Sequence, residues 1–395
     1  MPAPPPTYIS PPEGWVKKEK KEGLIMHFYL PTKIYSEHNC IQNHKTELVS
    51  LGTKALIVTG SHSSKKNGSL DHVMTALHDM DKPYCLFDEI EENPSVELMV
   101  RAAEFGKKEC ADFIIGIGGG SPLDASKAIA ILMKNPEYDG SVFYQKIELD
   151  AYPVAAIPTT AGTGSEITPY AILTRHDKQT KQSIYQKVFP KLALIDSQYL
   201  LTASIQVRAN TAIDALAHLL ESYVNCKATD YSRMFCEYAL KLFSRIKDRL
   251  KEEATTKIPS KDLDFYDTLM TISTMAGMTI SHTGTSLPHG MSYFLTYHHN
   301  IPHGKAVGTF LGSYLEHCKE ESTKTLLLSL MGFESIKDFK QFLHNVLSTV
   351  SLTTDEINTY SDNMMENTAK LTNCPYPITK GLMQKMFSES VEIIN

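Results

Sequence analysis

Short, almost continuously apolar segments alternate with amphipathic ones in the first half of the chain. Residues 54–60 (KALIVTG) and 112–118 (DFIIGIG) are apolar at consecutive positions, which is typical of strands buried on both faces of a parallel sheet. Residues 95–110 have helical periodicity, and Asn93 is the expected N-cap of that helix. The pattern predicts an α/β domain over residues 24–200, with strands at 54–60, 83–90, 112–118, 153–159 and 192–196.

After residue 200 the strand signals fade and helical periodicity takes over. An all-α domain is therefore expected over residues 201–395, with helices at 204–225, 230–254, 262–281, 305–330, 335–348, 354–370 and 378–393. The opening residues 1–23 (MPAPPPTYISPPEGWVKKEKKEG) are rich in proline and charge and have little to bury. This composition predicts a flexible tail, either a plain extension, which it favours, or a docking peptide.

Composition and charge narrow the functional classes. A chain of 395 residues with 42% hydrophobic residues can bury two cores. A net charge of −6 gives no basic surface for nucleic acid, so no nucleic-acid partner is expected. No apolar run is long enough to span a bilayer, so no membrane association is expected. Seven scattered cysteines without a CxxC pair, and no signal-peptide pattern, predict a cytoplasmic protein.

Four residues in the second half have the identity and spacing of a metal site. Asp214 and His218 lie four apart on a predicted apolar helix, so their side chains project from one face. His289 and His303 each stand between a proline and a glycine, which predicts two rigid turns. One carboxylate and three imidazoles suit Fe(II), with Zn(II) as the alternative, and do not suit Mg²⁺ or Ca²⁺.

Two polar turns follow predicted parallel strands and favour nucleotide binding. The first contains Gly118, Gly119, Gly120 and Ser121 and leads directly into a helix, whose N-terminus attracts phosphate. Lys127, in that helix, is expected on its surface. The second turn contains the hydroxyls of Thr159, Thr160 and Thr163 beside glycines. Both turns leave the carboxyl ends of strands, where open α/β sheets bind nucleotides.

Taken together, these motifs resemble the iron-containing (group III) alcohol dehydrogenase family. The markers are GGGSPLDASKAIA at 118–130, PTTAGTGSE at 158–166, IDALAHLLESY at 213–223 and two His-Gly pairs fourteen residues apart. The resemblance extends from about residue 27 to residue 387. It implies a Rossmann-like domain followed by a helical domain, the dehydroquinate synthase-like superfold, with catalysis in the cleft between them.

The resemblance also implies an activity and its site residues. It assigns Asp214, His218, His289 and His303 as metal ligands, which is the set that the spacing indicates. It implies hydride transfer between nicotinamide C4 and a small primary alcohol or aldehyde, in a protein that forms a homodimer or larger homo-oligomer. The cofactor would lie along the two polar turns, and Lys181 resembles a lysine that the family places near the ribose.

Two departures from the family pattern concern proton transfer and cofactor choice. Many members carry a proton-relay histidine where this chain has Tyr293, so Tyr293 either relays a proton or packs on the nicotinamide, with His299 as a substitute relay. Many members that use NAD(H) end the strand corresponding to 54–60 with aspartate, where this chain has Gly60. Ser61 and Lys65 follow, so we expect NADP(H) to be favoured over NAD(H).

Three alternatives stay open at this stage. The chain could be a zinc-dependent glycerol or diol dehydrogenase, a sugar-phosphate cyclase related to dehydroquinate synthase, or a catalytically silent assembly partner. A cyclase needs basic residues for its substrate phosphate, and Lys305 is the only lysine or arginine in residues 282–305. The expected substrate pocket includes Phe294 and Tyr297, whose apolar character favours short aliphatic alcohols and aldehydes.

Overall fold

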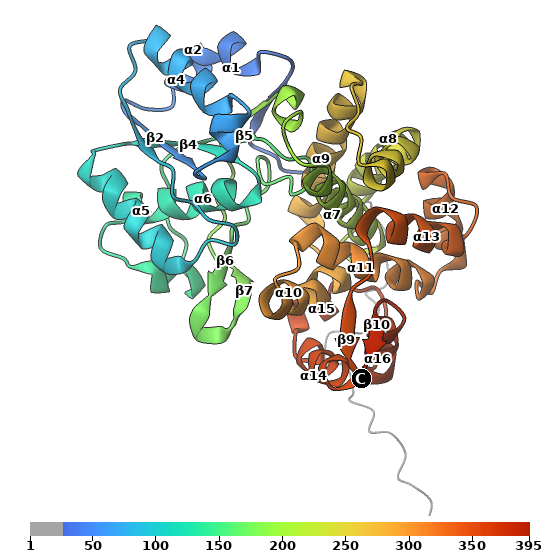
Figure 1. The fold of residues 1–395 in the computed structure, drawn as a ribbon. Helices are drawn as coiled ribbons and strands as arrows, with labels where there is room; N and C mark the ends of the chain where they lie inside the picture. Colours follow the sequence, from blue (N-terminus) through green and yellow to red (C-terminus); the bar gives the residue numbers. More distant parts are fainter. Residues whose placement is uncertain (1–26) are drawn as a thin grey trace, which may run out of the picture.

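The computed structural model describes residues 27–395, so the predicted tail at 1–23 lies outside the described residues. A parallel six-stranded sheet occupies the first half of the chain, and helices dominate the second half (Figure 1). The fold class predicted from the sequence is therefore confirmed. The predicted division at residue 200 falls at the end of a 3₁₀ turn, Ser197–Leu200, before the first long helix of the second half.

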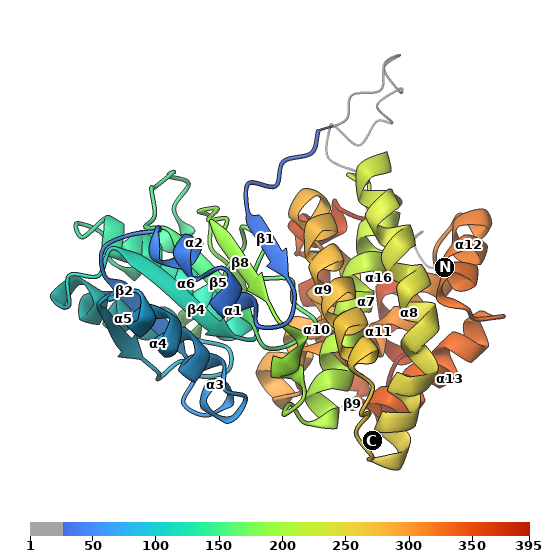
Figure 2. The same ribbon diagram turned by 90° about the horizontal axis from the view of Figure 1, so that it is seen from above.

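All five predicted strands form, and four of them are buried on both faces, whereas the strand predicted at 83–90 is a partly exposed edge strand. A short edge strand that the pattern did not predict joins them. In spatial order the sheet contains β1 (Lys33–Ser36), β8 (Leu192–Ile195), β5 (Val154–Pro158), β4 (Phe113–Gly118), β2 (Ala55–Thr59) and β3 (Tyr84–Phe87). The helices α1 (Cys40–Asn43), α2 (Lys45–Val49) and α4 (Ser69–Asp79) pack on one face, and α5 (Val96–Lys108) and α6 (Gly120–Lys134) on the other (Figure 2).

The N-cap predicted for α5 is wrong by two residues. Ser95 caps the helix, and its hydroxyl accepts the Leu98 amide hydrogen at 3.3 Å. Asn93 has a left-handed backbone (φ 57°) and accepts a hydrogen bond from the Thr174 hydroxyl through its carbonyl oxygen. A second feature that the pattern missed is an antiparallel hairpin, β6 (Ile172–Arg175) and β7 (Thr180–Ser183), which extends from the sheet domain toward the helices (Figure 1).

The second half is a helical domain with one small parallel pair of strands, β9 (Ser351–Thr353) and β10 (Glu392–Ile394). Two predicted helices are each split by a short loop, and the end of a third becomes β10. The helices are α7 (Ile205–Val224), α8 (Asp230–Thr256), α9 (Leu263–Thr283), α10 (Leu287–His299), α11 (His303–Glu316), α12 (Glu321–Met331), α13 (Ile336–Leu347), α14 (Thr354–Met365), α15 (Thr368–Leu371) and α16 (Lys380–Ser388). Within residues 27–395, no helix has the length and apolar composition that crossing a bilayer requires.

The loop after β5 joins the two halves of the molecule. The Cβ that a side chain at Gly164 would add lies 2.5 Å from Cα of Gly277 on α9, so the two backbones touch. At Gly162 the added Cβ would lie 2.6 Å from the Thr211 side chain on α7. Because both positions carry glycine, the loop fits directly against the two long helices that carry much of the helical core.

Candidate metal and nucleotide site

Helix α7 carries the first two candidate ligands into the middle of the helical domain. It is buried along most of its length, and Asp214 and His218 are 2% and 5% exposed. The four-residue spacing brings His218 Nε2 to 4.0 Å from Asp214 Oδ1. The other ring nitrogen, Nδ1 of His218, lies 3.2 Å from the Gly162 carbonyl oxygen of the loop after β5. This contact fixes the proton on Nδ1 and leaves Nε2 free toward Asp214.

His289 and His303 lie in the first turns of two helices, so the prediction that they stand in two rigid turns is wrong. His289 is the third residue of α10, after Pro288. His303 is the first residue of α11, and Pro302 is the N-cap. The first amides of a helix have no hydrogen-bond partner within the helix, so proline loses nothing there, and its fixed φ angle already suits a helix. This preference explains why a proline precedes each of these two histidines.

The four predicted ligands converge. Asp214 Oδ1 lies 3.4 Å from His289 Nε2 and 3.7 Å from His303 Nε2. One ligand atom from each of these three residues lies within 4.8 Å of the others. The His218 ring stacks on the His289 ring with centroids 4.5 Å apart, so the fourth residue borders the same point.

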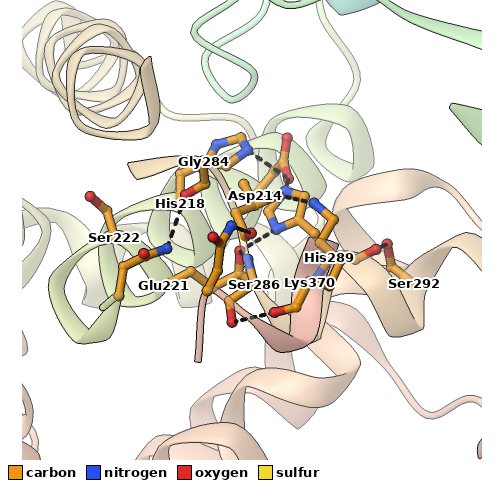
Figure 3. A network of polar contacts seen from close by, with 12 residues as sticks. Asp214, His218, Glu221, Ser222, Gly284, Ser286, His289, Ser292 and Lys370 are labelled. Carbon is orange, nitrogen blue, oxygen red and sulfur yellow. Dashed lines mark hydrogen bonds and ion pairs between the residues drawn. The ribbon is translucent and has the colours of Figure 1, made fainter. Parts of the chain in front are cut away.

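Glu221 supports the cluster and was not among the predicted site residues. It is fully buried on α7 and accepts three hydrogen bonds from the start of α10 (Figure 3). The Nδ1–H of His289 donates to it at 2.7 Å, and the amides of His289 and Ser286 donate at 2.9 and 3.1 Å. A carboxylate on Nδ1 of a histidine is the usual partner that orients a ligand imidazole. Glu221 follows Asp214 by two helical turns, which places it on the same face of α7, but this spacing alone does not distinguish it from a solvent-facing glutamate.

The unpaired atoms of the cluster fit a metal ion. With the Nδ1 proton of His289 held by Glu221, Nε2 presents a lone pair toward the Asp214 carboxylate. Among residues 27–395, neither His289 Nε2 nor Asp214 Oδ1 has a hydrogen-bond partner, although both are buried. Two acceptors facing each other at 3.4 Å cost free energy unless a cation lies between them. The donor set of three imidazoles and one carboxylate fits Fe(II) or Zn(II).

The charge states of the cluster also suit metal ligands. Burial lowers the pKa of His218 to about 4 and lowers the pKa of His303 well below its ordinary value. Burial alone would raise the pKa of Asp214, but the surrounding histidines outweigh it and lower that pKa. Burial alone would lower the pKa of His289, but the neighbouring Glu221 and Asp214 carboxylates outweigh it and raise that pKa. His218 and His303 are thus held as neutral imidazoles and Asp214 as an ionised carboxylate, which are the forms that bind a divalent ion, and His289 gives up its Nε2 proton when the ion binds.

Replacing Glu221 by glutamine should loosen metal binding without removing a ligand. The amide keeps the shape but loses the charge that holds the Nδ1 proton of His289. We expect iron affinity to fall about 10- to 100-fold, measured by competition with a chelator. Glu237→Gln on α8 is the control, since within residues 27–395 Glu237 accepts a hydrogen bond only from the Tyr223 hydroxyl. Unchanged affinity in Glu221→Gln would show that Glu221 does not orient His289.

The two predicted phosphate-binding turns pack against each other at the carboxyl ends of β4 and β5. Gly118 has φ 149°, and an added Cβ would lie 2.6 Å from Pro122. Added Cβ atoms at Gly119 and Gly120 would lie 3.1 and 2.9 Å from the side chains of Thr160 and Thr163. Helix α6 begins at Gly120 with no side chain capping its first amides, which leaves them available to an anion. Ser121 accepts a hydrogen bond from the Asn93 amide, and Thr159 is buried beside this turn.

Lys127 is not on the helix surface, contrary to our expectation. It is fully buried, and its ammonium donates to the Ser165 hydroxyl and the Tyr170 carbonyl oxygen, both at 2.7 Å. Burial lowers the pKa of Lys127 to about 8. Lys127 therefore fastens α6 to the loop after β5. Lys181, on the hairpin strand β7, donates to Asn93 Oδ1 at 2.7 Å, and burial lowers its pKa.

The residues expected at the adenosine end lie after β2. Gly60 lies close to the Ile90 carbonyl oxygen, which an added Cβ would approach to 3.0 Å. Ser61 is exposed. The Lys65 ammonium forms an ion pair with Asp88, just past β3, at 2.6 Å.

The two candidate relay residues lie in different surroundings. The Tyr293 ring faces the His303 ring, with centroids 6.4 Å apart and planes 22° apart, so Tyr293 borders the cluster. His299 lies at the far end of α10, where Nε2 is 2.9 Å from the Tyr360 hydroxyl on α14. Phe294 also stacks on Tyr360, at 5.0 Å, as part of the core. Of these α10 residues, only Tyr293 contacts a candidate ligand.

A pocket of about 460 Å³ opens between the hairpin and α10. Lys181 lines it from the sheet domain, and Thr296, Tyr297 and Asn300 line it from the helical domain. Three acidic residues, Glu91, Glu92 and Glu97, also line it, together with Arg101. The pocket therefore places Tyr297, but not Phe294, beside an opening between the two domains.

Comparison with protein-family models assigns both halves of the chain. Residues 31–197 match the iron-containing alcohol dehydrogenase model, and residues 208–390 match the C-terminal model of the Fe-containing alcohol dehydrogenase family. Both matches lie within the described residues and together include all four candidate ligands.

Individual relatives agree with these matches. The NADPH-dependent butanol dehydrogenase of Clostridium saccharobutylicum is 30% identical over 292 residues, which is 73% of this chain and 72% of that protein. A choline dehydrogenase of Bacillus subtilis is 30% identical over 300 residues, 73% of this chain and 72% of that protein. Among solved structures, an iron-containing alcohol dehydrogenase of Thermotoga maritima superposes with a TM-score of 0.85 at 32% identity, covering 93% of this chain and 99% of that one.

Proposed function

The chain belongs to the iron-containing alcohol dehydrogenase family, and we propose that it interconverts a small primary alcohol and its aldehyde with a nicotinamide cofactor. The observation that carries this proposal is the facing pair of buried acceptors, Asp214 Oδ1 and His289 Nε2, which need a cation between them. We assign Asp214, His218, His289 and His303 as ligands of Fe(II), for which Zn(II) is the alternative.

The residues of the chain have distinct tasks in this reaction. Asp214, His218, His289 and His303 would hold a divalent ion, which would supply Lewis-acid chemistry for the oxygen of the alcohol or aldehyde. Glu221 holds the His289 ring, and Gly162 holds the His218 ring, so both imidazoles keep one orientation. The glycine turn at the start of α6 would hold the cofactor phosphates, and Lys181 would hold the ribose. Tyr293 would pack beside the nicotinamide rather than relay a proton. His299, whose ring contacts the Tyr360 hydroxyl, would take no part in proton transfer from the substrate.

We further propose that NADP(H) is favoured over NAD(H). Gly60 offers no carboxylate to repel a 2′-phosphate, and the exposed Ser61 and Lys65 follow it. The ion pair between Lys65 and Asp88 is half-exposed, and such pairs contribute only about 0–1 kcal/mol. A phosphate can therefore draw Lys65 away from Asp88 at little cost. The similarity to an NADPH-dependent butanol dehydrogenase supports this choice.

Aldehyde reduction by iron-reconstituted protein tests both parts of the proposal. With butanal as substrate, we expect a higher kcat/KM for NADPH than for NADH. Lys65→Ala should lower the NADPH value about tenfold and leave the NADH value within about twofold, because a charged hydrogen bond contributes roughly 1.5 kcal/mol. Lys45→Ala, which breaks a similar surface pair with Asp79, is the control.

The assay tests the cofactor preference and the enzymatic activity separately. A kcat/KM ratio clearly favouring NADH would reject the cofactor choice alone. Protein that binds neither metal nor reduced cofactor, and reduces no aldehyde, would reject the enzymatic proposal and leave the assembly partner as the remaining function. The homodimer that the family resemblance implies stays a prediction.

A further inference from the structure

A lysine beside the metal cluster has a positive charge with no assigned role. Lys370 lies on α15, and its stem packs on Gly290, where an added Cβ would be 3.1 Å from Lys370 Cγ. Its ammonium lies 5.6 Å from the centre of the Tyr293 ring and donates to the Thr285 hydroxyl. Lys370 thus contacts the segment just before α10 and the first two turns of that helix.

The same two turns of α10 carry the metal cluster. Gly290 follows the candidate ligand His289, and Tyr293 faces the candidate ligand His303. The Tyr293 ring therefore neighbours both the His303 ring and the Lys370 ammonium. Figure 3 shows Lys370 and Ser286 beside His289 and Glu221, where the Ser286 hydroxyl contacts the Lys370 carbonyl oxygen.

The Lys370 ammonium forms no close ion pair within the described residues, although its charge adds to that of His289 in lowering the pKa of the buried Glu221 carboxyl. Among residues 27–395, no carboxylate oxygen lies within 4.0 Å of its ammonium, whereas Lys65 and Lys340 each have such a partner. Glu221 is the carboxylate at the base of this region, and its oxygens are occupied by the amides of Ser286 and His289 and by the His289 ring. The hydroxyl of Thr285 and the face of Tyr293 leave donor hydrogens of the ammonium free.

We propose that Lys370 binds a carboxylate of the substrate, so that the substrate class is short hydroxy acids and the corresponding aldehyde acids. This inference rests on the proposed dehydrogenase function. In the oxidation, the carbinol carbon gives a hydride to C4 of the oxidised nicotinamide, and the hydroxyl gives its proton to solvent. The products are the aldehyde acid, the reduced cofactor and one proton. The carboxylate is unchanged and only anchors the molecule.

Two substrates of equal length provide the test. Succinic semialdehyde and butanal have the same carbon chain and differ by the carboxylate. We expect wild-type protein to have the higher kcat/KM for succinic semialdehyde, through a lower KM. Lys370→Met, which keeps the stem, should lower the ratio of the two kcat/KM values about 50-fold, and Lys370→Arg should restore most of it. Lys319→Met is the matched control, because Lys319 also lies over a tyrosine ring, that of Tyr376.

A binding measurement separates anchoring from catalysis. Titration calorimetry with 4-hydroxybutyrate should give about 50-fold weaker binding to Lys370→Met than to wild type, and no detectable difference for 1-butanol. If the two kcat/KM values fall equally, Lys370 supports only the start of α10, and the inference is overturned. Wild-type protein that reduces butanal and prefers it to succinic semialdehyde also overturns the inference but leaves the proposed function intact. Wild-type protein that reduces neither overturns both.

Discussion

Replacing Asp214 by asparagine is expected to remove bound iron and to lower aldehyde reduction at least about a thousandfold, roughly 4 kcal/mol of barrier. The amide has nearly the shape of the carboxylate but not its charge. Asp214 is the residue whose oxygen lies near all three candidate imidazoles, at 3.4, 3.7 and 4.0 Å. Metal analysis of the purified variant, together with the butanal assay, measures both effects.

The fold should survive this substitution. In metal-free protein the surrounding histidines outweigh burial and stabilise the Asp214 carboxylate, so asparagine should lower the melting temperature of the metal-free form without unfolding it at room temperature. Asp248→Asn, at an exposed position on α8, is the control for preparation and handling. Full iron content in Asp214→Asn, with activity near wild type, would refute the assignment of the metal site.

The sequence predicted the sheet well because burial on two faces leaves a strong signal. The strand at 112–118 is observed at Phe113–Gly118, since every residue in it must be apolar or small. Strands β1 and β7 were missed because they are short and partly exposed at edges, where polar residues are tolerated. The break between α11 and α12, within the helix predicted at 305–330, was missed because the residues around Lys319 have no strong helix-breaking signal.

The sequence predicted the ligands of the candidate metal site but not the residues that hold those ligands in place. Asp214 and His218 follow from helical spacing, and the two Pro-His-Gly segments were recognisable although they start helices. Glu221 and Lys127 could not be identified as buried partners from one sequence, because charged residues in a helix usually face solvent. Lys370 was missed for another reason: it is brought beside Tyr293 only by the packing of α15 on α10.

Gly304 controls how closely α11 approaches α7, and so how closely His303 approaches Asp214. An added Cβ at Gly304 would lie 1.9 Å from the Asn210 carbonyl oxygen and 2.5 Å from its carbonyl carbon. These are backbone atoms of α7, one turn before Asp214, and cannot move aside as a flexible side chain could. Any side chain at position 304 must therefore push the start of α11 away from α7.

Gly304→Ala should consequently damage stability and metal binding together. Overpacking of this kind costs about 1–3 kcal/mol or more, which lowers the melting temperature by roughly 2–12 °C for a domain of this size. Because His303 is adjacent, iron content should fall in the variant that still folds. Gly381→Ala is the matched control, since an added Cβ there has nothing within 4 Å and helical alanine replaces glycine favourably. If Gly304→Ala keeps both its melting temperature and its iron, close contact between α7 and α11 does not set the position of His303.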